Sequence, residues 1–157
     1  MGLFSGIQDV TPTGLSGNYI KPGVHLLELM RCTQGQSRKK VGFMVAEFKV
    51  ISSDAHSPGE RVSYMCMADK DNFVSNCKAL FMAIVADFGG IELNQLDHSS
   101  IDEATAESIT AEPGTAYKGV KLLCTAINVP IKSKPGEMFT KCIWDVSAPE
   151  ENQETPF

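Results

Sequence analysis

The sequence lacks the features that mark metal-binding, secreted and membrane-spanning proteins. None of its five cysteines forms a Cys-x-x-Cys pair, and its three histidines have no ligand spacing, so we expect reduced thiols and no metal site. No apolar run reaches the ~18–20 residues of a membrane span. The first residues have neither the basic start nor the apolar stretch of a secretion signal. These absences predict a cytoplasmic protein that needs no cofactor and no membrane.

Groups of residues that could carry catalysis are also missing. A small nuclease would need carboxylates at metal-binding spacing, or a histidine paired with a nucleophile. The carboxylates gather instead in residues 87–112 and in the last eight residues, without such spacing. We therefore expect that the protein is not an enzyme.

The net charge of −5 conceals a segregation of charge along the chain. Residues 18–50 hold six basic residues against two carboxylates, and residues 116–148 hold five against two. Residues 87–112 hold seven carboxylates and no lysine or arginine. A local basic face governs phosphate binding more than the total charge does. The acidic stretch is interpreted either as a solvated helix or as a segment that shields the basic face or contacts a protein.

The 157 residues suit one domain, and their patterns divide it into strands and helices. Five segments have the alternation and the turn boundaries of strands: 18–32, 42–51, 61–68, 118–131 and 138–146. Within 71–90, apolar residues recur at steps of three and four, which predicts a helix of about 16 residues that ends at Gly89-Gly90. A second short helix is expected in 98–110, where Ser100 and Glu103 form a capping box. The rings of Phe48, Phe81 and Phe88 are assigned to the core.

Three strands, a helix and two further strands form the chain order of the OB-fold. That fold is a five-stranded, partly open Greek-key barrel that binds oligonucleotides and oligosaccharides. We therefore expect a mainly β protein with one or two helices inserted between its third and fourth strands. A small α+β sandwich would have the same order and stays an alternative.

The strand segments carry a family resemblance. The stretches YIKPGVHLLEL, FMVAEFKVISSD and SPGERVSYM resemble the N-terminal half of phage-encoded single-stranded-DNA-binding proteins, and GEMFTKCIWDV resembles their closing strand. The resemblance implies an OB-fold domain over 19–147, preceded by a flexible arm over 1–18. It also implies sequence-independent binding and protection of single-stranded DNA in viral replication, recombination or repair.

The last eight residues, EENQETPF, resemble the acidic tip of bacterial single-stranded-DNA-binding proteins. In that family the tip docks onto proteins of replication, recombination and repair. Residues 148–157 are therefore expected to be a disordered tail that recruits partners. Its candidate contact residues are Glu150, Glu151, Glu154, Pro156 and Phe157.

Binding of single strands without sequence preference needs cations along the phosphates and aromatic rings on which bases stack. We expect Phe139 and Lys141 to point outward and Trp144 inward, and leave the face of Tyr64 open. The candidate DNA-binding residues are Arg31, Arg38, Lys39, Lys40, Phe43, Lys49, Arg61, Tyr64, Tyr117, Lys118, Lys121, Lys132, Lys134, Phe139 and Lys141.

A second function stays open beside DNA binding. A domain of the same fold could be a structural or protein-interaction component of a virion that does not bind DNA. The basic segments and the Pro-Phe end favour DNA binding over this alternative. The sequence leaves the oligomeric state open, with a homo-oligomer as one option.

Overall fold

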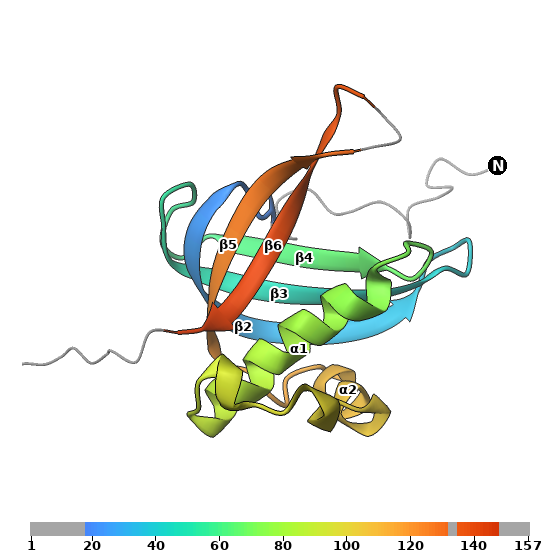
Figure 1. The fold of residues 1–157 in the computed structure, drawn as a ribbon, viewed down its shortest axis with the longest axis vertical. Helices are drawn as coiled ribbons and strands as arrows, with labels where there is room; N and C mark the ends of the chain where they lie inside the picture. The colour runs from blue at the N-terminus through green and yellow to red at the C-terminus, as the bar shows by residue number, and fades with distance from the viewer. Residues whose placement is uncertain (1–17, 132–134, 148–157) are drawn as a thin grey trace, which may run out of the picture.

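The structure is a computed structural model that describes residues 18–131 and 135–147. It is mainly β, with one sheet and two α-helices (Figure 1). The strands are β1 (Asn18–Tyr19), β2 (Gly23–Gln36), β3 (Gly42–Ser53), β4 (Arg61–Met67), β5 (Lys121–Pro130) and β6 (Met138–Val146). Between β4 and β5 lie α1 (Phe73–Gly89), the 3-10 turns η2 (Leu93–Gln95) and η3 (His98–Ser100), and α2 (Glu103–Thr110). Neither helix of the described part is long and apolar enough to cross a membrane.

The strands lie in the order β1-β4-β3-β2-β5-β6. The five long strands pair antiparallel with their neighbours, and the two-residue β1 pairs parallel with the start of β4. Figure 1 shows the β5–β6 hairpin crossing the other long strands steeply and projecting past them. The predicted order of five strands with helices between the third and the fourth is therefore confirmed.

The strand β2 joins the two parts of the sheet. It pairs with β3 from His25 to Gln36, and its first half, from Gly23 to Glu28, also pairs with β5. Register shifts interrupt the β2–β3 ladder after Leu26 and after Leu29. Such irregularities bend a strand and increase its twist. As a result β2 stays paired with β3 as far as Gln36, while its pairing with β5 ends at Glu28.

The linker before β5 covers the edge of β2 that β5 leaves. The Leu29 amide donates to the Val120 carbonyl, and the Cys32 amide donates to the Gly114 carbonyl, both at 2.8 Å. Gly114 has φ +82°, and a Cβ there would lie within 2.5 Å of the Cys32 carbonyl oxygen. Only glycine fits this close approach, which removes an open strand edge.

The inner face of the sheet and the helix α1 enclose the core. The alternation predicted for 42–51 is confirmed, because the side chains from Met44 to Val50 are buried at every second position. Trp144 on β6 is buried as expected, and its ring stacks on Phe48 of β3 at a centroid distance of 5.2 Å. The core therefore connects the edge strand β6 to the middle of the sheet.

Two local predictions about the helices are wrong. Phe88 is 65% exposed rather than part of the core, because it lies in the last turn of α1, where its ring meets only the edge of Tyr117. Ser100 does not cap α2: it ends η3, and its hydroxyl donates to the Asp97 carbonyl. Asp102 is the N-cap of α2 and accepts from the Thr105 amide at 2.9 Å. The predicted end of α1 is correct, since Gly90 caps it in the left-handed conformation.

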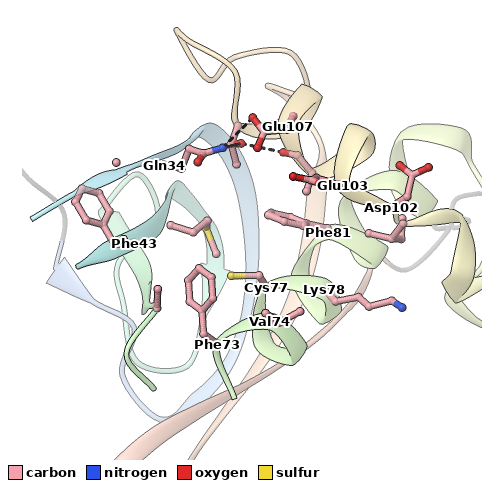
Figure 2. Close-up of a pocket in the computed structure, with 17 residues that line it drawn as sticks. Gln34, Phe43, Phe73, Val74, Cys77, Lys78, Phe81, Asp102, Glu103 and Glu107 are labelled. Atoms are coloured by element: carbon pink, nitrogen blue, oxygen red, sulfur yellow. Dashed lines mark hydrogen bonds between the residues drawn. The ribbon is translucent and has the colours of Figure 1, made fainter. Parts of the chain in front are cut away.

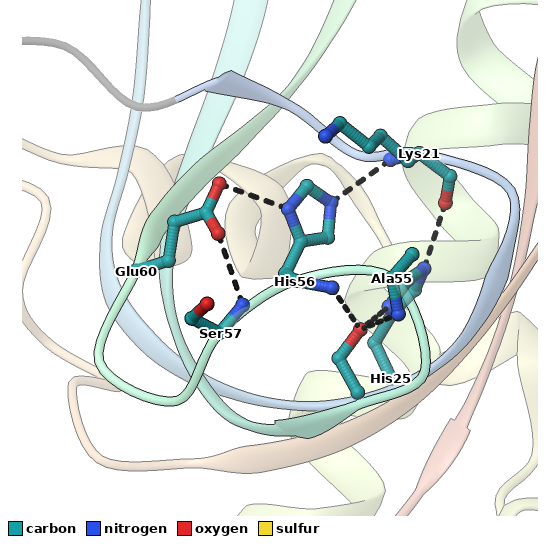
Figure 3. Close-up of polar contacts among 7 residues, drawn as sticks. Lys21, His25, Ala55, His56, Ser57 and Glu60 are labelled. Atoms are coloured by element: carbon teal, nitrogen blue, oxygen red, sulfur yellow. Dashed lines mark hydrogen bonds and ion pairs between the residues drawn. The ribbon is translucent and has the colours of Figure 1, made fainter.

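A buried polar cluster fixes the β3–β4 loop against the start of β2 (Figure 3). The Ser53 hydroxyl oxygen accepts from the amides of Ala55 and His56 and lies 2.7 Å from His25 Nδ1. The His56 ring accepts from the Lys21 amide and lies 3.0 Å from a Glu60 carboxylate oxygen. Both imidazoles are buried, yet each nitrogen has a polar partner.

We predict that Ser53→Ala destabilises the protein, because it leaves two backbone donors and one buried ring nitrogen without a partner. Unsatisfied buried groups cost roughly 1–3 kcal/mol each, so the urea midpoint should fall clearly. The matched control is Ser52→Ala, at an exposed position on the same strand, which should leave the midpoint nearly unchanged. Equal midpoints for the two variants would contradict the role given to Ser53.

Candidate nucleic-acid interface

A row of charged residues crosses four strands on the outer face, which is the face of the sheet opposite the core. The strand registers place Glu28 between Lys121 and Lys49, and Arg61 beyond Lys49. The three cations are exposed. Directly opposed residues have Cβ atoms ~4.5–5.5 Å apart, so this basic row presents three positive groups across β5, β2, β3 and β4.

Farther along the same strands the outer face becomes apolar. Phe43 lies opposite Gly35 on β2, and a Cβ at Gly35 would lie 3.0 Å from Phe43 Cζ. The ring of Phe43 therefore covers the glycine backbone. Met65 on β4 is 44% exposed and pairs with Val45. The outer face thus has a basic end and an apolar end.

Arg31 lies between these two ends. It pairs with Glu47 across β2 and β3, and its Nε lies 3.9 Å from a Glu47 carboxylate oxygen. Both side chains are substantially exposed, so the pair contributes little to stability. The guanidinium remains accessible to a phosphate.

The tight β2–β3 turn holds three of the predicted basic residues, Arg38, Lys39 and Lys40, all exposed. The Lys40 amide donates to the Ser37 carbonyl at 2.8 Å, and Lys40 has φ +63°. A left-handed residue other than glycine costs free energy, which a tight turn of this kind tolerates. The turn concentrates positive charge at one end of the sheet.

The β5–β6 hairpin carries the remaining outward-facing candidates. Phe139 is 44% exposed and Lys141 is exposed, while Trp144 is buried, so the predicted faces of β6 are confirmed. Ile127 lies opposite Lys141 and is 41% exposed. Aromatic, aliphatic and cationic groups therefore share the outer side of the projecting hairpin.

Two predicted aromatic residues lie apart from this face. Tyr64 is on the inner side of β4, and its ring meets the edge of Trp144 at a centroid distance of 5.1 Å. Burial raises the pKa of its phenol. Tyr117 lies in the linker before β5, against Phe88 at 4.9 Å. Lys118 is exposed in the same linker.

Some predicted residues cannot be placed. Lys132 and Lys134 lie outside the described residues, as do the tail residues Glu150, Glu151, Glu154, Pro156 and Phe157. Of the predicted arm over residues 1–18, residues 1–17 lie outside them too, and Asn18 belongs to β1.

The sequence reasoning missed two apolar residues on the outer faces, Met65 and Ile143, which are 44% and 49% exposed. The strand alternation carried the signal, because Met65 shares its side of β4 with Arg61, and Ile143 shares its side of β6 with Lys141. Neither residue is aromatic, so the search for stacking platforms passed over them.

A cavity of about 480 Å³ adjoins the apolar end of the outer face (Figure 2). The ends of β2 and β3, the first half of α1, and α2 form its walls. Phe43, Phe73 and Phe81 supply apolar surface, and Cys77 lies among them. A hydrogen bond with Cys66 and burial raise the pKa of Cys77, so its thiol is neutral.

The described residues hold no group of three or more histidine, cysteine or acidic side chains that could bind a metal ion. All five cysteines are free thiols, and four of them are buried.

We predict that Asp102→Ala loosens α2, the helix that forms one wall of the cavity. Asp102 accepts from the amide and the hydroxyl of Thr105, and these bonds hold its pKa below the usual range. This stabilisation is complete above the unfolded pKa of ~3.9 and is lost as the pH falls through the lower folded value. Amide hydrogen exchange in residues 106–110 should be faster in the variant at pH 6.

The control for this measurement is Glu112→Ala, which removes an exposed carboxylate beyond the end of α2. It should leave the exchange of residues 106–110 unchanged. Unchanged exchange in Asp102→Ala would show that the cap does not hold the helix.

Comparison of the sequence with known proteins assigns no family. No protein-family model matches the sequence. No match was found among curated proteins. The function is therefore inferred from the residues of the site.

Proposed function

We propose that the protein binds single-stranded DNA without sequence preference, through the outer face of the sheet and the β5–β6 hairpin. The observation that carries the proposal is that Lys121 of β5, Lys49 of β3 and Arg61 of β4 lie around Glu28 of β2, on the same face of the sheet as half-buried Phe43. Cations that follow phosphates and apolar faces that receive bases are the two requirements of such binding.

The strand order supports an OB-fold interpretation of the sheet. The first long strand, β2, pairs with both the second and the fourth long strands, and the fifth follows the fourth. Contacts of Trp144 with Phe48 and Tyr64 link β6 to β3 and β4 through the core, as in a partly open barrel. OB-folds bind oligonucleotides on the face of their second and third strands and with the loops after the first and fourth.

The candidate residues correspond to those regions. Phe43, Lys49 and Arg61 lie on the second and third long strands, β3 and β4. Arg38, Lys39 and Lys40 lie in the loop after the first. Phe139 and Lys141 lie on the hairpin that follows the fourth. The position of the basic groups therefore agrees with the nucleic-acid side of that fold.

The proposal is tested by fluorescence anisotropy with a labelled 30-nucleotide oligo-dT and a duplex of equal length, over a salt series. We expect tight, salt-dependent binding to the single strand and much weaker binding to the duplex. Phe139→Ala should weaken binding by roughly 1–3 kcal/mol, the value of one base–aromatic stack. Tyr64→Phe keeps an inward ring and should bind like the parent protein.

The double variant Lys49→Gln/Arg61→Gln tests the basic row. Each phosphate contact contributes about 0.7 to the slope of log affinity against log salt for a single strand, so the slope should become shallower. The control Lys70→Gln/Lys78→Gln removes the same charge from the β4–α1 turn and from α1, outside the basic row, and should keep the slope. Absence of binding to oligo-dT at low salt would overturn the proposal and favour a structural component of a virion.

We further propose that the acidic tail recruits proteins of replication, recombination or repair and competes weakly with DNA for the basic face. Its three carboxylates and terminal Phe157 support this role. Deletion of residues 150–157 should tighten oligo-dT binding at low salt, because it removes an intramolecular competitor, and the gain should vanish at high salt. Replacement of the three tail glutamates by glutamine is the matched variant and should have the same effect. Unchanged affinity in both variants would contradict the competition.

A further inference from the structure

We infer that the cavity beside α2 is a docking site for a positively charged peptide segment of a partner protein, with one apolar side chain inserted between α1 and α2. This inference does not rest on DNA binding, since it concerns the cavity and its acidic rim and not the basic row. It follows from three properties of the cavity: its apolar interior, its acidic rim and the spacing of its carboxylates.

The interior is shaped for an apolar group. Its volume of about 480 Å³ lies within the range of ligand pockets, roughly 300–1,000 Å³. Phe73 and Ile101 line it and are only partly buried against the core. Val74 lines the same cavity and is 73% exposed. An aliphatic or aromatic side chain placed here would remove this apolar surface from water, which favours binding by roughly 25 cal/mol per Å².

The rim carries the opposite charge from the basic face. Glu103 and Glu107 line the cavity from α2, and Asp102 lines it from the N-cap position before this helix; all three are exposed. Lys78 also lines it, but its Nζ lies 3.3 Å from His98 Nδ1, and Figure 2 shows the side chain extending away from the three phenylalanines. Three carboxylates therefore stand against one amine among the lining residues, which favours a cation at the cavity.

Charge complementarity selects among possible occupants. A nucleic acid would bring phosphates to three carboxylates, and the tail of this chain would bring Glu150, Glu151 and Glu154. Both are polyanions and would be repelled. A segment rich in lysine or arginine is attracted, and such steering mainly raises association rate and specificity.

The spacing of the carboxylates favours a peptide over a small cation. Glu103 and Glu107 are one helical turn apart, so they lie on the same side of α2 with ~5–6 Å between their Cβ atoms. The Gln34 side-chain amide donates to both Glu107 and Thr110, which holds the end of β2 against α2. Two carboxylates at this separation match two basic side chains on either side of an inserted apolar residue.

Phe43 belongs both to the docking site and to the outer face. It lines the cavity and also lies on the sheet face that we assign to DNA. A peptide bound in the cavity would therefore lie next to that face. The inference itself requires only the cavity and its rim.

The experiment is an NMR titration of the ¹⁵N-labelled full chain without DNA. The probe is the synthetic peptide Lys-Lys-Leu-Phe-Lys-Lys, and the matched probe is Glu-Glu-Leu-Phe-Glu-Glu. We expect shift changes at the amides of Val74, Ile101 and Ala106 with the basic peptide only. Equal shifts with both peptides, or shifts that avoid these residues, would overturn the inference.

Two sets of variants then test separately how the rim and the interior of the cavity contribute to peptide binding. Glu103→Gln/Glu107→Gln should weaken binding of the basic peptide by about fivefold, because it removes two exposed carboxylates from the rim. Glu112→Gln/Glu137→Gln removes the same net charge away from the cavity and should have little effect. Ala106→Leu fills the cavity, and it should abolish the shifts while the rest of the spectrum stays folded.

A titration with oligo-dT distinguishes this site from the proposed DNA interface. DNA-induced shifts should appear at Lys49, Arg61 and Lys141 and not at Ile101 or Ala106. Shifts at Ile101 and Ala106 with oligo-dT but not with the basic peptide would make the cavity a base-binding pocket and would overturn the docking site. Failure of oligo-dT to bind anywhere would affect only the proposed function.

Discussion

The double pairing of β2 is the constraint on which the rest of the structure depends. One strand of 14 residues pairs with β3 from His25 to Gln36 and with β5 over its first half. Its second half would expose an open edge, and the linker with Gly114 covers that edge. Because β5 leaves β2 midway, the β5–β6 hairpin is free to cross the other strands and project beyond them (Figure 1).

Polar contacts fix the positions at which the sheet can bend. The Ser53 cluster ties the β3–β4 loop to the start of β2 and so anchors the strands that carry Lys49 and Arg61. In the last turn of α1, the Asp87 carboxylate accepts from the Lys121 amide and from the amide and hydroxyl of Ser147. One carboxylate therefore sets where β5 begins and where β6 ends. These contacts are directional and need partners in place, which gives the apolar core a single arrangement.

The fold separates two surfaces of opposite charge. The basic row lies on the sheet because strand alternation puts Lys49, Arg61 and Lys121 on the side that the core does not use. The acidic rim lies on α2, a helix inserted between strands, whose N-terminus favours carboxylates. A protein with net charge −5 can thus present a local positive face, since screening limits the reach of the acidic segment to about 8–10 Å at moderate salt.

The sequence by itself determined the order of strands and helices, the buried side of β3, the outward position of Phe139 and the segregation of charge. These features follow from periodicity and composition, which are local. The tertiary structure decided those side-chain positions that depend on residues distant in the sequence. Tyr64 lies on the inner side of β4 with Val62 and Cys66, where its ring meets Trp144 from far along the chain. Phe88 is 65% exposed in the last turn of α1, where its ring contacts Tyr117. The basic row and the acid-rimmed cavity arise only when register brings residues from separate strands and helices together, and no local pattern encodes that register.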